Sequence, residues 1–243
     1  MLGVILAAGR GTRLMPITAE KPKALVEVGQ GLSLLELSAR SLMTSGLTDI
    51  VVVVGYMGKE IERAVKELSS YGAEMIVVEN PEYWRGNGIS LLKAWGAVGS
   101  EDFVLAMCDH LVEPAIYEAA ARAGPLCMCV DREPAYLLEP GEAMKVLLGP
   151  DDTIRTIGKE LAKWDAIDMG VFCLNETVFH VLEDLARKRA LISLSDCVRS
   201  LTTKGAPLRA LDMTGSLWTD VDTPRALEHA RVQVLPKLLE LLG

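Results

Sequence analysis

Cysteine is scarce in this sequence and forms no recognisable pairs. Five cysteines stand among 243 residues, at positions 108, 127, 129, 173 and 197. No Cys-x-x-Cys pair occurs and no histidine lies at zinc-finger spacing, so the sequence predicts neither a disulfide framework nor a zinc site. Cys127 and Cys129 alternate within an apolar run, where small thiols are commonly buried on one face of a strand.

A long apolar run and an excess of positive charge are also missing. No apolar stretch approaches the roughly 18 residues that a membrane-spanning helix needs, and the N-terminus has no features of a cleaved signal. We therefore expect a cytoplasmic protein with no membrane segment. The formal net charge of -8 argues against a nucleic-acid partner, because extended nucleic-acid binding requires a basic surface. Any polyanion must be held locally.

The chain has the composition of a globular protein, with 50% hydrophobic and 24% charged residues. In its first half, apolar β-branched runs alternate with helical patterns. This alternation predicts an α/β fold with a mixed, mostly parallel central sheet and helices on both faces. The expected strands lie at 2–7, 49–54, 74–78 and 102–108, and the expected helices at 33–45, 59–70 and 89–98.

The pattern changes after about residue 125. Strand-like segments follow with little helix between the middle ones, and GPDD at 149–152 predicts a hairpin turn, so the sheet should gain a mixed extension. A final helix should kink at Pro236. We expect one domain, 1–243, with a nucleotide-binding half at 1–124 and an acceptor-binding half at 125–243. The later strands are expected at 125–130, 143–148, 153–157 and 167–174, and the final helix at 223–241.

A glycine-rich segment follows the first expected strand. Residues 9–14 read GRGTRL, which matches the dinucleotide fingerprint G-x-G-x-x-G except that Arg13 replaces the third glycine. An arginine cannot give the close helix packing that this glycine provides, and the next helix begins only near Ser33. The motif G-x-x-x-x-G-K-[ST] is also missing. The sequence therefore disfavours a dinucleotide-dependent oxidoreductase.

The same segment concentrates positive charge. Between positions 10 and 23 there is one acid, Glu20, and four basic residues: Arg10, Arg13, Lys21 and Lys23. Glycines let backbone N–H groups approach a phosphate, and cations can project into the same space. Solvated loop charges are the alternative. However, loops after the carboxyl ends of parallel strands line the ligand crevice of open α/β sheets, so we expect a phosphate site here.

LAAGRGTRL followed by KPKAL resembles the signature of the nucleoside-triphosphate-dependent sugar-phosphate nucleotidyltransferases, G-x-G-x-R with a lysine ten residues after the arginine. The resemblance covers nearly the whole chain and implies a Rossmann-like nucleotidyltransferase fold. It implies that Arg13 and Lys23 are catalytic and bind the nucleotide phosphates. Four more positions match the family's nucleotide-binding loop, two alanines at the base pocket and two glycines that shape the loop: Ala7, Ala8, Gly9 and Gly11.

An apolar strand ends abruptly at Asp109 and His110, in FVLAMCDHLVEP. In a doubly wound sheet of order 3-2-1-4 this fourth strand lies beside the first, so Asp109 should face the glycine-rich loop. Mg²⁺ prefers one or two carboxylates with substrate phosphates and water, so Asp109 is predicted to hold Mg²⁺. The alternative is a helix cap before Pro114. His110 is expected to be a satisfied polar residue that orients Asp109.

A second carboxylate is expected from SLWTDVDTPRALEHA, 216–230. Asp220 and Asp222 both precede a helix with Pro224 in its first turn, and either could be its cap. The family resemblance implies a metal-binding aspartate just before the final helix, often as Asp-Thr-Pro, which matches Asp222. Asp220 matches a Trp-x-Asp pattern found in other relatives, so the choice between the two stays open.

The acceptor phosphate should need a cation of its own. Taken alone, Lys159 is a surface lysine. Its surroundings, GKELAKWDAIDMGVF, resemble the acceptor-binding segment of the same family. That resemblance implies that Lys159 binds the acceptor phosphate and that Asp168 contacts polyol hydroxyls.

The loop in ENPEYWRGNGISLLKA has two interpretations. It can be a plain strand-to-helix connection, with the helix capped near Ser90. In the superfamily the corresponding loop reads the nucleotide base, which implies base and ribose contacts for Asn87, Gly88 and Ser90.

The sequence shows no convincing Ser-His-Asp or Cys-His arrangement. A phosphate monoester has a second pKa of about 6 and is largely dianionic at neutral pH, so as a nucleophile it needs no general base. The remaining barrier is electrostatic and geometric. A basic loop facing two metal-binding aspartates meets that need.

GNGISL, CDH, GKELAKWDAIDMGVF and WTDVDTP are together more similar to the CTP:inositol-1-phosphate cytidylyltransferases than to hexose-1-phosphate enzymes. The resemblance implies Mg²⁺-dependent transfer of CMP from CTP to inositol 1-phosphate. The alternatives are another NTP, another acceptor such as a hexose 1-phosphate or phosphocholine, or a non-catalytic nucleotide-sensing module. Many inositol relatives are fused to a membrane phosphotransferase that consumes CDP-inositol. We expect a functional or fused link to such an enzyme, and a homodimer is left open.

Overall fold

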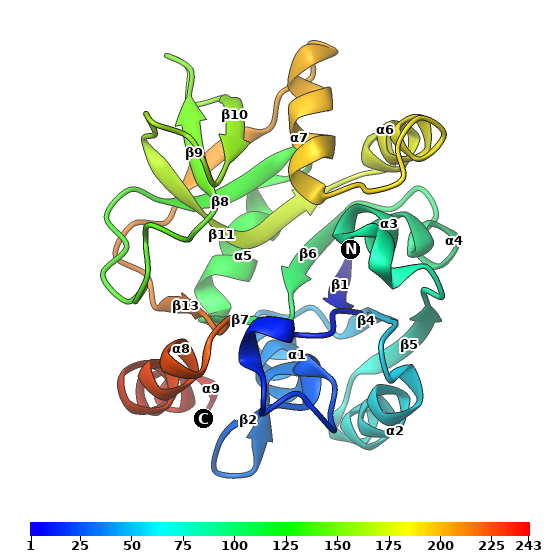
Figure 1. The fold of residues 1–243 in the computed structure, drawn as a ribbon, viewed down its shortest axis with the longest axis vertical. Coiled ribbons are helices and arrows are strands. Elements are labelled where there is room, and N and C mark those ends of the chain that lie inside the picture. The colour runs from blue at the N-terminus through cyan, green and yellow to red at the C-terminus, as the bar shows by residue number, and fades with distance from the viewer.

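Seven strands form the main path of a central sheet in the computed structural model, which describes the backbone of residues 1–243 and every side chain except that of residue 71 (Figure 1). Two further strands, β8 (Cys127–Asp131) and β12 (Arg209–Asp212), extend the sheet from β11. In spatial order the seven strands are β10 (Ile154–Gly158), β9 (Lys145–Leu148), β11 (Ala166–Leu174), β6 (Phe103–Met107), β1 (Leu2–Ala7), β4 (Asp49–Val54) and β5 (Glu74–Glu79).

The order of the strands brings two functional segments together. β1 pairs in parallel with β4 and β6, and β4 pairs in parallel with β5, which is the predicted order 3-2-1-4. Leu6 of β1 lies opposite Met107 of β6. The loop after β1 and the segment after β6 therefore leave the same edge of the sheet side by side.

The second half extends this sheet in the predicted mixed manner. β11 pairs antiparallel with β6, β8 and β9, β9 pairs antiparallel with β10, and β12 pairs in parallel with β8. The predicted hairpin at 149–152 connects β9 to β10, with the Gly149 N–H donating to the Thr153 carbonyl at 2.8 Å. Figure 1 shows this extension continuing the sheet above β6.

Helices cover both faces of the sheet, as predicted (Figure 1). Successive strand residues point to opposite faces. Ile5 therefore belongs to one apolar core, which is shared with α1, α2, α5, α8 and α9, while Val4 belongs to the other, shared with α3, α4, α6 and α7. The helices are α1 (Leu34–Thr44), α2 (Gly58–Leu68), α3 (Asn87–Lys93), α4 (Trp95–Val98), α5 (Pro114–Ala123), α6 (Thr177–Ala186), α7 (Leu194–Thr203), α8 (Pro224–His229) and α9 (Leu235–Leu242).

Two helix boundaries differ from the sequence prediction. The helix expected from residue 89, with a cap near Ser90, begins at Asn87 and is divided into α3 and α4. The final helix is interrupted before Pro236, by a π-helical turn over Ala230–Val234. Proline has no N–H to donate to the preceding turn, and the wider turn accommodates that loss.

Two small sheets were not predicted. β2 (Glu27–Gly29) pairs with β3 (Leu32–Ser33), and β7 (His110–Val112) pairs antiparallel with β13 (Trp218–Asp220). The second pair joins the segment after β6 to the segment before α8, which are more than 100 positions apart in the chain.

All five cysteines are free and buried. Over the helices that the structure describes, none combines the length and the apolar character needed to cross a membrane.

Candidate active site

The segment after β1 folds into a loop in which Lys23 passes across Gly11. Gly11 has a left-handed φ of 68°, and a Cβ on it would lie 2.8 Å from the Cβ of Lys23. Only glycine tolerates this approach. The Thr18 hydroxyl donates to the Gly11 carbonyl at 2.8 Å and closes the loop. Gly11 thus shapes the loop for a steric reason, whereas Gly9 is exposed at the rim of a cavity.

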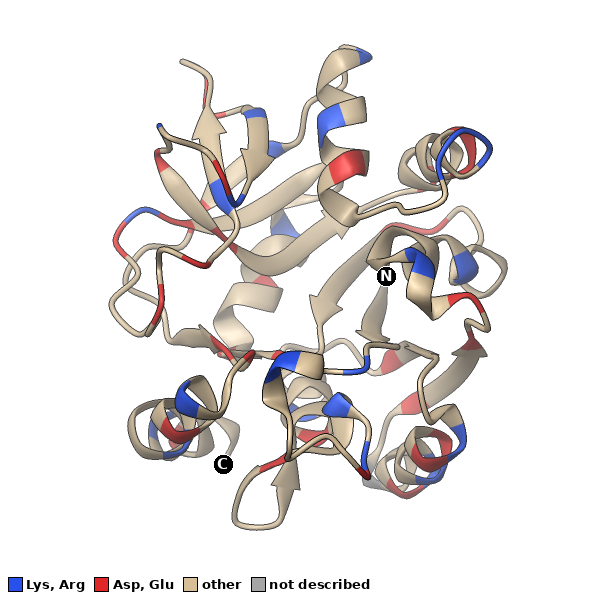
Figure 2. Ribbon diagram, viewed as in Figure 1, with Lys and Arg blue, Asp and Glu red and all other residues tan. Residues whose placement is uncertain are grey.

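Lys23 places its ammonium between two carboxylates. Its Nζ donates to Asp109 Oδ2 at 2.6 Å and to Asp222 Oδ1 at 2.5 Å, and Arg13 donates to the other oxygen of Asp222. We call Arg13, Lys23, Asp109 and Asp222 the Lys23 cluster. Figure 2 shows basic positions on the segment after β1 beside acidic positions near β7 and β13.

The charges of the cluster stabilise one another. Burial alone would lower the pKa of Lys23, but Asp109 and Asp222 raise that pKa above its usual value, so the lysine is charged at neutral pH. Burial also disfavours ionised Asp109, yet Lys23 and the hydrogen bond from His110 hold the pKa of Asp109 well below its usual range. The site therefore holds an ammonium with little access to water between two carboxylates that are partly exposed.

The other two basic residues of the loop lie outside the cluster. The guanidinium of Arg10 stands over the ring of Tyr56, 5.0 Å from its centroid, and Lys21 is exposed. The concentration of positive charge seen in the sequence therefore divides into two residues in the cluster and two at its margin.

The β7–β13 pair holds the two carboxylates together. His110 of β7 lies opposite Asp220 of β13, and the Val221 N–H donates to the Asp109 carbonyl at 2.8 Å. Asp222, just beyond β13, reaches Lys23, while Asp220 lines the second cavity described below. The geometry favours Asp222 over Asp220 as the partner of Asp109.

None of these aspartates caps a helix. The N-cap of α5 is Glu113, and the N-cap of α8 is Thr223, whose hydroxyl accepts from the Ala226 N–H at 3.1 Å. The alternative capping roles considered for Asp109, Asp220 and Asp222 are therefore wrong. This leaves their carboxylates available for ligand binding.

Two cavities adjoin the Lys23 cluster. The first, of about 220 Å³, opens at the carboxyl ends of β1 and β6. Lys23 and Asp109 form one side of it, and Tyr83 lies in its wall. Five residues predicted to contact the nucleotide line this cavity: Ala7, Ala8, Gly9, Asn87 and Ser90.

The loop before α3 is held by close backbone contacts. A Cβ on Gly88 would lie 2.8 Å from the Ile192 side chain, and a Cβ on Gly86 would lie 2.3 Å from the Ile192 carbonyl oxygen. Gly88 therefore faces Ile192 and does not line the first cavity. Asn87 Oδ1 accepts from the Leu194 N–H at 2.8 Å, which turns this residue toward both cavities.

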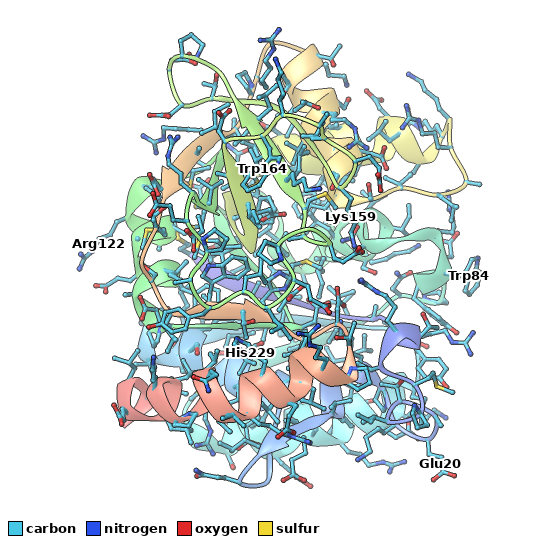
Figure 3. All side chains as sticks on the ribbon, turned by 60° about the vertical axis from the view of Figure 1, so that its left-hand side comes forward. Glu20, Trp84, Arg122, Lys159, Trp164 and His229 are labelled. Carbon is cyan, nitrogen blue, oxygen red and sulfur yellow. The ribbon has the colours of Figure 1, made fainter. Side chains whose placement is uncertain are left out.

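The neighbouring side chains of Tyr83 and Trp84 have different surroundings, and Ser90 shares those of Tyr83. Ser90 Oγ accepts from buried Asn80 at 3.0 Å and lines the first cavity, as does Tyr83. Trp84 points away from the body of the molecule and is 64% exposed (Figure 3).

The second cavity, of about 150 Å³, lies between the Lys23 cluster and the second half of the chain. Lys159, which projects from the loop after β10, and Asp168 of β11 both line it (Figure 3 labels Lys159). Asp168 Oδ1 accepts from the Gly170 N–H at 2.8 Å. Burial nevertheless raises the pKa of Asp168 to about 6. A carboxylate that is poorly solvated at a cavity wall is suited to accept hydroxyl hydrogen bonds.

The two cavities meet at the Lys23 cluster. Asn87 and Met107 line both of them. Asp109 lines the first, Asp222 lines the second, and Lys23 Nζ bonds to both carboxylates. Groups bound in the two cavities would therefore approach each other beside a cation and two carboxylates.

The sequence did not predict several residues that line the cavities or support their walls. A Cβ on Gly55 would lie 2.6 Å from the Cβ of Tyr83 and 2.9 Å from that of Ala8, so Gly55 lets the cavity wall form. The sequence does contain an indication of this role, because Gly55 directly follows an apolar strand in VVVVGY. Trp218 and Ser195 line the second cavity and gave no local signal.

The donor set is suited to one particular kind of metal ion. No group of three or more His, Cys, Asp or Glu side chains that could hold a metal occurs among the described residues. Asp109 and Asp222 nevertheless share a partner in Lys23 Nζ. Mg²⁺ typically takes one or two carboxylates and completes its shell with phosphates and water, so two convergent carboxylates fit it.

The profile of the MobA-like NTP transferase domain matches residues 3–207. A bifunctional IPC transferase and DIPP synthase from Rubrobacter xylanophilus is 38% identical over 95% of this chain and 51% of its own length. The protein of the same name from Aquifex aeolicus is 35% identical over 99% of this chain and 53% of its own length. The chain thus spans about half the length of these curated relatives.

Solved structures share the whole fold. The inositol-1-phosphate CTP transferase from T. maritima superposes with a TM-score of 0.85 and 28% identity, covering 99% of this chain and 95% of that chain. A UDP-glucose pyrophosphorylase complexed with UDP-glucose superposes with a TM-score of 0.79 at 18% identity, covering 98% of this chain and 100% of that chain. The second likeness concerns the fold alone.

Proposed function

This chain belongs to the family of MobA-like NTP transferase domains and is a nucleotidyltransferase, and on that premise we propose that it transfers CMP from CTP to inositol 1-phosphate. An oxygen of the acceptor phosphate attacks the α-phosphorus of CTP. The bond from the α-phosphorus to the bridging oxygen of the β-phosphate breaks, and the products are CDP-inositol and pyrophosphate.

The choice of substrates is supported by the relatives. The T. maritima protein, which resembles this chain over nearly its full length, is named for inositol 1-phosphate and CTP. The two bifunctional IPC transferases and DIPP synthases align with 95% and 99% of this chain but with only about half of their own length. We propose only the IPC transferase reaction for this chain and not the DIPP synthase reaction that their names also give.

The observation that carries the proposal is the Lys23 cluster at the junction of two cavities. A nucleotide in the first cavity would place its phosphates beside Lys23 and Arg13, since Lys23 lines that cavity and Arg13 shares Asp222 with it. An acceptor in the second cavity would place its phosphate near Lys159. Fixed cations on both sides reduce the repulsion between a phosphate dianion and the triphosphate.

No side chain is needed to remove a proton from the acceptor. A phosphate monoester is already largely dianionic at neutral pH, because its second pKa is about 6. The protein's contribution is therefore to bring the two phosphoryl groups into line and to hold the charge that develops on the pyrophosphate. We assign Arg13 and Lys23 to that task.

Asp109 and Asp222 would hold Mg²⁺. When bound, the ion supplies positive charge at the transferring phosphoryl group and at the leaving pyrophosphate. Lys23 Nζ now bonds to both carboxylates, so it is placed to contact the phosphates that enter with the ion. We do not assign Asp220 to the ion, because Lys23 Nζ bonds to Asp109 and Asp222 and Asp220 lies outside this cluster.

The remaining assignments concern recognition. We propose that Asn87 and Ser90 contact the base and ribose directly, and that Gly88 contributes by setting the path of their loop. Asp168 is proposed to accept hydrogen bonds from the acceptor's hydroxyls. On the other side of the nucleotide, the loop residues Ala7, Ala8, Gly9 and Gly11 are proposed to shape the pocket.

A matrix of substrates tests the proposal. Four nucleoside triphosphates are each combined with inositol 1-phosphate, glucose 1-phosphate and phosphocholine, and pyrophosphate release is measured with Mg²⁺ and with EDTA. Asp109→Asn prepared in parallel controls for contaminating enzymes. We expect pyrophosphate and a nucleoside diphosphate-inositol only from CTP, inositol 1-phosphate and Mg²⁺. Product from a hexose phosphate alone would overturn the acceptor, and no pyrophosphate from any pair would overturn nucleotidyl transfer.

A further inference from the structure

The imidazole of His110 lies in a narrow slot between an aromatic ring and a stretch of bare backbone. The indole of Trp218 is parallel to it, with ring centroids 6.0 Å apart and 4° between the planes. The second wall is Gly170, where a Cβ would lie 2.9 Å from His110 Cδ2 and 3.0 Å from Cγ. The slot exists because residue 170 has no side chain and adopts a φ of +72°.

Trp218 is itself fixed by a buried carboxylate. Its Nε1–H donates to Asp131 Oδ2 at 2.7 Å, and the other oxygen of Asp131 accepts from the Glu133 N–H at 2.9 Å. Trp218 and Asp131 are each 1% exposed. Burying a carboxylate is costly unless its hydrogen bonds are made, and this one uses its two oxygens to hold the indole and a turn.

The opposite end of this arrangement is the Asp109 carboxylate. His110 Nδ1 lies 2.9 Å from Asp109 Oδ1. Because an aspartate carboxylate accepts hydrogen bonds, we assign Nδ1 as the donor. Lys23 Nζ takes the other oxygen, Oδ2, at 2.6 Å. Both oxygens of Asp109 thus have a fixed donor, and together the donors set the rotation of the carboxylate.

We propose that Asp131, Trp218 and His110, with Gly170 as the slot wall, form a positioning chain that fixes the Asp109 carboxylate for a divalent cation. The inference rests on the proposed function only for the role of Asp109. None of the four residues needs to touch substrate for this purpose. His110 acts through Asp109, and Trp218 and Asp131 act through His110.

A positioning role and a merely structural role predict different outcomes at His110. If His110 only fills space, an aromatic ring without a donor should serve equally well. If it positions Asp109, the donor at Nδ1 is essential and the remainder of the ring is less so. Asparagine carries its amide nitrogen at the place of Nδ1, and phenylalanine carries a ring with no donor.

Binding of Mn²⁺ alone to the full chain, measured by the loss of the free-ion EPR signal, separates these outcomes without any reaction. Outer partners of metal-ligating carboxylates are typically worth about 10–100-fold in metal affinity. We therefore expect His110→Phe to weaken Mn²⁺ binding by about tenfold or more. His110→Asn should bind close to the wild type. Equal binding by His110→Phe and the wild type, or equal losses in both variants, would overturn the proposal.

Gly170→Ala provides a second test with a matched control. The added methyl group presses on the His110 ring, so Mn²⁺ binding should weaken as in His110→Phe. Gly215 also has a left-handed φ, +91°, but a Cβ there would meet nothing within 4 Å among the described residues. Gly215→Ala should carry the backbone strain and keep Mn²⁺ binding. Equal effects of the two alanines would contradict the slot.

A ligand-free measurement keeps this inference distinct from the proposed function. In a double-mutant cycle of thermal unfolding, His110→Phe and Asp109→Asn should shift the Tm non-additively, because the two side chains share a hydrogen bond. Additive shifts would overturn the positioning chain whatever the substrates prove to be. Conversely, if no substrate pair released pyrophosphate but the Tm shifts were non-additive, the proposed reaction would be overturned and the positioning chain would stand.

Discussion

Lys23 combines a position beside the glycine-rich loop with contact to two acids. Its side chain is 12% exposed and bonds to Asp109 and Asp222. Removing it leaves two carboxylates facing each other without an ammonium between them. Its proposed interaction with incoming phosphates is therefore inseparable from its role in holding the two carboxylates together.

Lys23→Ala is expected to lower turnover by roughly a hundredfold or more, the scale found when one preorganised contact to a transition state is removed. Asp109→Ala should have a similar effect. Steady-state turnover in saturating Mg²⁺ and substrates measures both, with Lys21→Ala as the control, since Lys21 is an exposed lysine of the same loop. Near-normal turnover in Lys23→Ala or Asp109→Ala would show that its assigned role is wrong.

Asp222 and Asp220 can be separated by their dependence on metal. Asp222→Asn should raise the Mg²⁺ concentration for half-maximal activity by about tenfold or more, because Asp222 shares Lys23 with Asp109. Asp220 lies two positions away and outside the Lys23 cluster, so Asp220→Asn should change that concentration far less. Titrations of activity against Mg²⁺ for the two variants provide the comparison. The reverse order would move the second metal site to Asp220.

Asp168 makes stability depend on pH. Burial raises its pKa from the ordinary 3.8 to about 6, so below pH 3.8 the group is protonated in both states and contributes nothing. As pH rises from about 4 to 6 the unfolded chain ionises first, and the folded protein loses at most about 3 kcal/mol of stability.

Asp168→Asn should remove this loss and still accept the Gly170 N–H bond. We expect the variant to match the wild type near pH 4 and to be more stable above pH 6, in urea unfolding at both values. The same stability difference at both pH values would contradict the assigned pKa. Acceptor binding should weaken in the same variant, since its proposed partner is the carboxylate.

At the scale of elements, the loop before α3 depends on a segment far away in the sequence. Gly86 has a φ of +100°, and its Cα faces the Ile192 carbonyl. The Gly88 N–H donates to that carbonyl at 3.1 Å, and the Ile192 N–H donates to the Arg85 carbonyl at 2.8 Å. These bonds hold the wall of the first cavity against the segment before α7.

Gly86→Ala should push this wall apart. Gly124 provides the matched control, because its φ of 77° and ψ of 179° lie in the same backbone region as the 100° and 167° of Gly86, and a Cβ there meets nothing within 4 Å in the described part of the chain. Gly124→Ala should cost about 1–3 kcal/mol of unfolding free energy from backbone strain alone. Gly86→Ala should cost about 1–3 kcal/mol more, from the collision. Urea unfolding compares them, and equal losses would refute the close contact.

Most, but not all, of the helices and strands could be predicted from the sequence. The alternation of apolar runs and helical patterns predicted the strand order and the helices on both faces of the sheet. Lys23 and Asp109 were expected to lie close together because β1 and β6 are adjacent, and Lys23 bonds to Asp109. The β7–β13 pair was missed because three-residue strands carry no periodic signal. The start of α3 was predicted two residues late because Asn87 is held by Leu194, more than 100 positions away.

The residues of the candidate site could be predicted only where they belong to a recognisable local motif. Arg13, Lys23 and Asp222 lie in recognisable motifs, and the structure places them in one cluster. The slot around His110 could not be predicted, since Gly170 and Trp218 reach it only through the pairing of distant strands. Tertiary contacts of this kind leave no trace in spacing or composition.

At the scale of the whole molecule, one sheet joins the predicted halves. β11 of the second half pairs with β6 of the first, and both apolar cores draw residues from each half. We therefore expect one cooperative unfolding transition for the single predicted domain, with tryptophan fluorescence and far-UV circular dichroism coinciding in urea. Two separated transitions would instead support independent halves. The homodimer and the link to a membrane phosphotransferase stay predictions.

The net charge of -8 affects how phosphorylated ligands approach the molecule. A net negative charge disfavours the approach of phosphorylated metabolites in general. Figure 2 shows basic positions on the segment after β1, and two of them, Lys23 and Arg13, line the first and the second cavity respectively. Binding is thereby confined to a site where opposite charges already lie within hydrogen-bonding distance.

The central claim is that one divalent ion and one nucleotide are held jointly by the first cavity and the Lys23 cluster. A crystal of the protein soaked with Mn²⁺ and CTP tests it most directly, because anomalous scattering locates the manganese. We expect a single peak coordinated by Asp109 and Asp222, with the triphosphate against Lys23. A peak on Asp220 or elsewhere, or the two aspartates turned to separate ions, would contradict it.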